Sequence, residues 1–95
     1  MPALTRLGDK SSGHDSCAPM PLIEASGNVF IDGKGAGRLG DQYAAHGCIV
    51  HGSHQDTIAA GSPTVTINGR PAARVGDDIT LAGMVQEGSV SVFAG

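Results

Sequence analysis

Residues 65–78 read V-T-I-N-G-R-P-A-A-R-V-G-D-D, and an earlier segment of the chain repeats them. Residues 29–41, V-F-I-D-G-K-G-A-G-R-L-G-D, match at a shift of 36 positions. The shared features are β-type apolar residues, an Asx-Gly turn, a following Lys or Arg, and a final Arg-x-Gly-Asp. A partial copy, R-L-G-D, opens the chain at residues 6–9. Such a repeat is the unit from which the fold is built.

The repeats favour short strands joined by tight turns. Asp32-Gly33 and Asn68-Gly69 lie between β-type segments, and Asx-Gly there predicts a type I′ turn because both central residues need positive φ. Fifteen glycines and five prolines argue against long helices, because Gly costs about 1 kcal/mol and Pro about 3 kcal/mol in a helix interior. Strand-like segments are expected at residues 4–9, 29–31, 64–67, 79–81 and 90–93.

The repeat occurs three times. Arg-x-Gly-Asp begins at Arg6, Arg38 and Arg74, and a turn with a serine introduces a strand at Ser26, Ser62 and Ser89. We expect the first copy to be cut in two by the chain termini. Units of this size bury their apolar faces only against each other. The sequence therefore predicts an all-β fold, a small cone of short β-strands and hairpins with pseudo-threefold symmetry, as a single domain over residues 1–95.

The Arg-x-Gly-Asp segments are interpreted as structural rather than as a binding motif. Gly allows a tight turn, Asp caps the backbone, and the arginine stem is expected to pack over the interface between repeats.

Composition excludes several classes of function. The net charge is −3 with only six Lys and Arg, so no basic stripe is available for nucleic acid. There is no run of 18 apolar residues and no signal peptide, so we expect no integral membrane segment and no ordinary export route. With three aromatic residues in 95, the core is small, and a metal or a partner surface is expected to help stabilise it.

The histidines follow the symmetry of the repeat. His14 lies five residues after Asp9, and His46 lies five residues after Asp41. Because equivalent positions of symmetry-related repeats point towards the axis, these two histidines are predicted to bind one metal ion. A solvated polar loop is the alternative interpretation of so many histidines.

The third repeat lacks this donor, since Ala82 stands five residues after Asp77. The missing ligands are expected from residues 42–57, interpreted as a loop, as are residues 10–21. The donors in that second loop are Cys48, His51 and His54. Histidine and cysteine are ordinary ligands of four-coordinate structural zinc. Cys17 and Cys48 could instead form a disulfide, but without an export signal we expect reduced thiols or metal ligation.

The tetrapeptide Pro71-Ala72-Ala73-Arg74, within this ordered series of repeats, resembles the signature of the PAAR-repeat proteins. The resemblance extends over nearly the whole chain. It implies a cone that sits on the blunt end of a trimeric VgrG-type β-helical spike, in a type VI secretion system or a related contractile phage tail. There the cone sharpens the spike for membrane puncture and effector delivery.

The resemblance also implies a metal near the apex, typically zinc, held by three histidines and one cysteine. The matching histidines here are His14, His46 and His54, with His51 as the rival for the third place. The family's Cys-Gly-Gly segment is replaced by Leu81-Ala82-Gly83, so His51 or Cys48 would take the place of the cysteine. A site made only of nitrogen ligands would make iron conceivable, although zinc is expected.

The resemblance implies one cap for each spike trimer, secreted effectors as further partners, and transient contact with a target membrane. The protein would be present in the bacterial cytoplasm during assembly and then leave the cell on the spike. The rival class is an enzyme that uses His14, Asp15 and Cys17, or Cys48 with His51, as nucleophile and base, or a zinc ion to activate water. A small glycine-rich cone leaves little room for a substrate, so no enzyme activity is expected. The main alternative is a free-standing zinc-binding interaction module without a puncturing role.

Overall fold

The computed structural model describes residues 1–13, 18–48, 52–80 and 83–95, and for residues 46–48, 52 and 53 it describes the backbone alone. All regular secondary structure within these residues is β-strand, which confirms the predicted fold class. The molecule is elongated, with extents of 36 × 23 × 22 Å. The strands form three antiparallel hairpins: β1 (Phe30–Ile31) with β2 (Lys34–Gly35), β3 (His46–Cys48) with β4 (Gly52–His54), and β5 (Thr66–Ile67) with β6 (Arg70–Pro71).

The two Asx-Gly turns are as predicted. Asp32 and Gly33 have φ of 54° and 79°, and Asn68 and Gly69 have φ of 55° and 77°. Positive φ at both central residues is the requirement of a type I′ turn. Each turn joins strands of two residues, in which the first residue of β1 and β5 is exposed and the second is buried.

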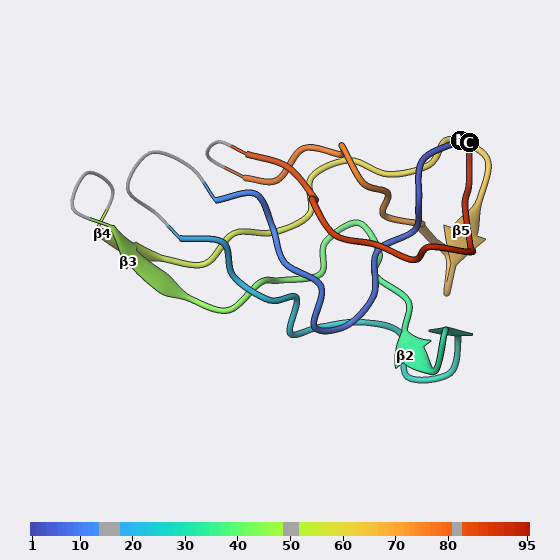
Figure 1. Ribbon diagram of the computed structural model, residues 1–95, viewed down its shortest axis with the longest axis horizontal. Helices are drawn as coiled ribbons and strands as arrows, with labels where there is room; N and C mark the ends of the chain where they lie inside the picture. The colour runs from blue at the N-terminus through green and yellow to red at the C-terminus, as the bar shows by residue number, and fades with distance from the viewer. Residues whose placement is uncertain (14–17, 49–51, 81–82) are drawn as a thin grey trace.

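The two ends of the chain together form the counterpart of a third hairpin. Ala3 is bridged to Phe93, and the Leu4 amide donates to the Val92 carbonyl at 3.0 Å. The same bond joins Ala36 to Val29 and Ala72 to Val65, at 3.0 and 2.9 Å. In Figure 1 the two termini lie beside each other at the end that also carries β2 and β5. The prediction that one copy is cut by the termini is therefore confirmed.

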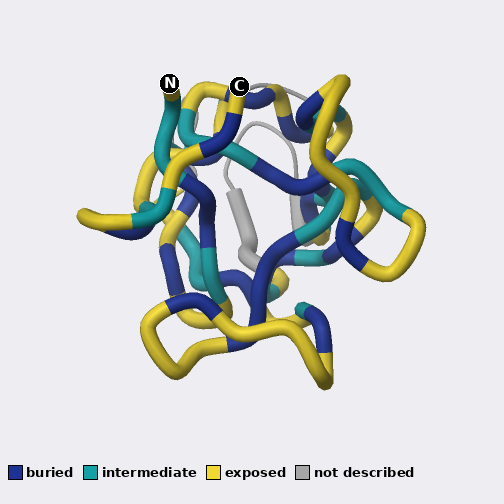
Figure 2. Tube along the Cα trace, turned by 90° about the vertical axis from the view of Figure 1, so that its right-hand side faces the viewer, coloured by how far each residue is buried: buried dark blue, intermediate teal, exposed yellow. Residues whose placement is uncertain are grey.

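Three backbone hydrogen bonds close the repeats into a ring. The Thr5 amide donates to the Ala73 carbonyl at 3.1 Å, Ala73 donates to Gly37 at 3.0 Å, and Gly37 donates to Thr5 at 3.0 Å. Each of these residues directly precedes the arginine of an Arg-x-Gly-Asp segment. A closed cycle of three equivalent bonds defines the approximate threefold axis that the sequence predicted. Figure 2, viewed along the long axis, shows exposed turns arranged around a buried centre.

The three serines at the strand entries have the same role. Each side-chain oxygen accepts hydrogen bonds from the amides two and three residues later. These bonds measure 3.2 and 2.9 Å at Ser26, 3.1 and 3.0 Å at Ser62, and 3.0 and 3.0 Å at Ser89. The buried hydroxyls thus satisfy backbone donors where each strand begins.

The Arg-x-Gly-Asp segments form three equivalent ion pairs. In each, the arginine Nε donates to the Asp Oδ2, and that oxygen also accepts the arginine's own amide. The Nε to Oδ2 distances are 2.9, 3.0 and 3.2 Å for Arg6, Arg38 and Arg74. The glycines between them, Gly8, Gly40 and Gly76, have φ of 90°, 93° and 95°. The structural interpretation of these segments agrees with this geometry, but the guanidinium binds the aspartate of its own turn, which the sequence analysis did not foresee.

The core consists of two clusters of buried residues. The cluster near the hairpins comprises Leu4, Ile31, Ala36, Ile67, Ala72 and Ala94. The second comprises Leu22, Tyr43, Ile58, Ala73, Ile79 and Val85. Most members fall into threefold sets, such as Leu4 with Ala36 and Ala72, because equivalent residues of the three repeats meet at the axis.

Two expectations about local structure were wrong. Residues 42–57, expected to be a loop, contain the β3–β4 hairpin. The strands expected at 4–9, 79–81 and 90–93 are reduced to isolated bridges, such as those of Leu4 with Arg74, Ile79 with Ile58 and Phe93 with Ala3. Residue 81 lies outside the described part of the chain.

Candidate functional site

Three loops, at residues 9–22, 41–58 and 77–85, leave the core in the same way, and we call them the apical loops. At the foot of each loop the last residue donates its amide to the carbonyl of the first, at 2.9 Å in all three. The β3–β4 hairpin of the second loop lies at the end of the molecule opposite the termini (Figure 1). We call this end the apex, and the end with β1–β2, β5–β6 and the paired termini the base.

The predicted metal ligands all fall in the first two apical loops. His54 ends β4, and its backbone lies directly opposite that of His46 in β3, while Cys48 is opposite Gly52. The remaining candidates, His14, Cys17 and His51, lie outside the described residues. The described residues alone bring no three His, Cys, Asp or Glu side chains together around a metal position. The ligand set therefore stays a prediction.

The His54 side chain, whose position is described, faces a buried carboxylate. Its Nε2 lies 3.5 Å from Oδ1 of Asp56, and the side chains are 15% and 2% exposed. The same Oδ1 accepts the hydroxyl of Thr80 at 3.4 Å. Histidines that bind metals commonly direct their second nitrogen to a carboxylate. Imidazole donors in the apical loops, one of them held against a carboxylate, fit a zinc or iron ion in their chemistry.

Tyr43 occupies the core below the apical loops and was not foreseen as a special residue. It is 1% exposed, and its hydroxyl has no hydrogen-bond partner among the described residues. Burial raises the pKa of Tyr43, and the carboxylates of Asp9, Asp56 and Asp77 raise it further. The phenol of Tyr43 therefore stays protonated and uncharged in the core.

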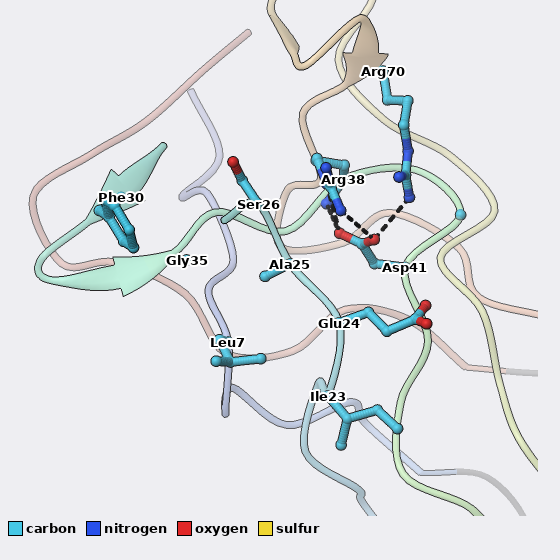
Figure 3. Close-up of a pocket in the computed structure, with 11 residues that line it drawn as sticks. Leu7, Ile23, Glu24, Ala25, Ser26, Phe30, Gly35, Arg38, Asp41 and Arg70 are labelled. Carbon is cyan, nitrogen blue, oxygen red and sulfur yellow. Dashed lines mark hydrogen bonds and ion pairs between the residues drawn. The ribbon is translucent and has the colours of Figure 1, made fainter. Parts of the chain in front are cut away.

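A shallow groove of about 570 Å³ lies on the side of the cone. Figure 3 shows Asp41 between two guanidinium groups in this groove. An Nη2 nitrogen of Arg38 and one of Arg70 lie 3.0 and 2.7 Å from Oδ1 of Asp41. The carboxylate of Glu24 accepts the Gln42 amide at 3.0 Å. These charged groups are engaged in holding the fold.

The base presents apolar residues on three lobes. Phe30 on the first lobe is 60% exposed and Phe93 on the terminal lobe is 47% exposed, while the equivalent of both on β5 is Thr66. Further exposed apolar residues of these lobes and their flanks are Met1, Val29, Val65 and Val90. Three similar lobes are thus arranged around one axis.

A family model confirms the resemblance that the sequence indicated. The PAAR motif matches residues 51–95, which include β5, β6 and the Pro71 to Arg74 signature. No curated protein matches the chain. Together with the all-β structure, this match is consistent with a PAAR-repeat protein, and the motif implies a role related to the spike tip of contractile injection systems. Within the described residues, no helix is long and apolar enough to cross a membrane.

Proposed function

We propose that the protein is a structural spike tip, whose base caps a trimeric VgrG-type spike and whose apex leads membrane puncture and effector delivery. The observation that carries this proposal is the closed ring of Thr5, Gly37 and Ala73, which gives a single chain three equivalent lobes. A single chain with three lobes can contact all three subunits of a trimer at once. We therefore expect one cap for each trimer.

The base has the properties of a docking surface. Phe30 and Phe93 are large apolar side chains that stay substantially exposed, and burial of such residues dominates interface energetics. The two-residue strands leave edges that can be extended by strands of the spike. Docking at the base would leave the apex as the leading point.

At the apex we propose a metal ion held by His14, His46 and His54, with His51 or Cys48 as the fourth ligand. Opposite residues of an antiparallel pair have Cβ atoms about 5 Å apart, and His46 and His54 occupy such positions. Zinc suits this donor set, with iron as the less favoured ion. The ion would cross-link the loops, since binding free energy at such a site adds to folding free energy.

The metal proposal is tested by metal analysis of the purified protein beside His14→Ala, His46→Ala and His54→Ala. We expect about one zinc per chain, less in each variant, and a lower melting temperature. Gln55→Ala, an exposed residue of the same loop, is the control and should keep its metal. If none of the three histidine variants changes metal content or melting temperature, the proposed apex is wrong.

The docking proposal is tested with Phe93→Asp in a pull-down against a VgrG-type spike trimer. We expect the substitution to abolish or strongly weaken capture, because a charge would be buried at the interface. Met84→Asp is the matched control: Met84 is 46% exposed, yet it belongs to the third apical loop rather than to the base. Zinc binding without any capture of the trimer would favour the free-standing interaction module instead.

This function sets where the protein would act. It would be assembled onto the spike in the bacterial cytoplasm and then expelled with it, touching the target membrane transiently. Secreted effectors would travel on the same spike.

A further inference from the structure

Among the described residues four aspartates are buried, and three of them are paired in the same way. Asp9, Asp41 and Asp77 each pair with the arginine of their own Arg-x-Gly-Asp segment, at 2.8 to 3.1 Å. Such pairing matters because a buried carboxylate without a compensating charge is costly. These three pairs are part of the framework of the base and core.

The fourth buried aspartate, Asp56, has a different setting. It belongs to the second apical loop rather than to an Arg-x-Gly-Asp segment, and Nε2 of His54 lies 3.5 Å from its Oδ1. The carboxylate is 2% exposed. Its charge is therefore placed where a cation bound at the imidazole would compensate it.

The position of Asp56 is fixed from two loops. Its carbonyl accepts the Tyr43 amide at 2.9 Å, and its Oδ1 accepts the Thr80 hydroxyl at 3.4 Å. That hydroxyl in turn accepts the Thr57 amide at 2.9 Å. Thr80 belongs to the third apical loop, the one without a histidine, so this loop reaches His54 through the carboxylate.

We propose that Asp56 is a positioning residue for the apical metal: it holds Nε2 of His54, so that the imidazole presents Nδ1 to the ion. The inference rests on the proposed metal site, and it adds which nitrogen binds and how the third repeat takes part. A carboxylate on the distal nitrogen fixes the tautomer and orientation of a ligand and makes it a stronger donor.

The first test is Asp56→Asn, with zinc affinity measured by competition against a chelator. We expect affinity to fall about 10- to 100-fold, the usual cost of losing such a partner, and Thr80→Val to cause a smaller loss. Asp78→Asn, an exposed aspartate of the third loop, is the control. Stability of the metal-free protein should not fall in Asp56→Asn, because the variant removes a buried charge.

The outcomes separate the two proposals. If His54→Ala leaves zinc affinity unchanged, the proposed ligand is wrong. If His54→Ala weakens binding and Asp56→Asn does not, the metal site stands and the positioning role is overturned. A loss of stability in Asp56→Asn that is equal with and without zinc would show a purely structural residue and would also overturn it.

A second readout does not depend on stability. In ¹⁵N-edited NMR spectra of the zinc-loaded protein, we expect His54 to carry its proton on Nε2 and the metal on Nδ1. Metal on Nε2 would contradict the inference, because that nitrogen faces Asp56.

Discussion

The base and the apex of this cone differ in how closely the three repeats copy one another. At the base and in the core, equivalent hydrogen bonds at the serines, the arginines and the central ring agree within a few tenths of an ångström. At the apex the three loops differ in length, and among the residues that the structure describes the second loop alone contains a hairpin. The threefold symmetry is retained where backbone hydrogen bonds join one repeat to the next.

The feet of the apical loops mark the boundary between these regions. All three feet are closed by the same amide-to-carbonyl bond of 2.9 Å. Up to the feet of the loops each repeat has to match its neighbours, because a change in one repeat would break a backbone hydrogen bond of the ring. Beyond the feet the three apical loops can differ from one another, and the candidate metal ligands lie in these loops.

The largest effect on the symmetric region is expected from Arg74→Met. It leaves the buried carboxylate of Asp77 without its guanidinium, and the loss of one partner of a buried charge pair is destabilising. Urea unfolding gives the free energy of unfolding.

Arg38→Met provides the matched control for that loss. Asp41 keeps a second guanidinium, that of Arg70 at 2.7 Å, so the loss should be smaller than in Arg74→Met. Equal losses in the two variants would show that the ion pairs do not account for the effect.

Gly37→Ala tests how tightly side chains pack around the ring of backbone hydrogen bonds. An added Cβ would lie 2.7 Å from Cγ2 of Thr5 and 2.9 Å from Cδ2 of Leu22, and overpacking of this kind costs about 1 to 3 kcal/mol. Gly27→Ala is the control, because nothing lies within 4 Å of its Cβ position and its φ is not positive. Thermal unfolding of both variants decides whether the axis is as tightly packed as described.

Tyr43→Phe examines the region between ring and apex. Because burial raises the pKa of Tyr43 in the folded state, the unfolded chain releases this proton first, above pH about 10. Folding stability should then fall by about 1.4 kcal/mol per pH unit until the folded-state pKa is reached. The variant should lack this decline and be at least as stable at pH 7, since it removes a buried hydroxyl that has no partner in the part of the chain that the structure describes. Parallel alkaline declines in the two proteins would contradict the assignment.

The smallest effect is expected from Asp32→Asn, which gives the first turn the residue type found in the second, Asn68. A hydrogen bond from Ser89, followed by those from Ser91 and Arg6, lowers the pKa of Asp32. Its contribution to stability is therefore present above pH about 4 and is lost as the pH falls through the lowered value. Acid unfolding curves should show a shallower loss in the variant, and a steeper one would refute this role.

The symmetric part of the molecule was predictable from the sequence. Asx-Gly turns, entry serines and Arg-x-Gly-Asp are local signals, and each recurs, so the repeat itself pointed to a closed threefold arrangement. The individual strands were less predictable: the segments around Ile79 and Phe93 form single bridges, because their partners come from distant parts of the chain. No local pattern specifies such a partner.

The apex was predictable in composition but not in geometry. The histidine spacing indicated which residues could meet. The β3–β4 hairpin, which sets His46 opposite His54, was missed because its two strands, H-G-C and G-S-H, contain no strong strand formers. The role of Asp56 could not be recognised either, since burial against His54 and Thr80 depends on two loops folding together. The one available signal was an aspartate two positions after a candidate ligand.

The most direct test of the central claim, that one pseudo-threefold chain caps a true threefold spike, is native mass spectrometry of this protein mixed with a VgrG-type spike trimer. We expect a single species with one copy per trimer, even when the cap is in excess. Three copies per trimer, or no complex under conditions where both proteins are folded, would contradict the account.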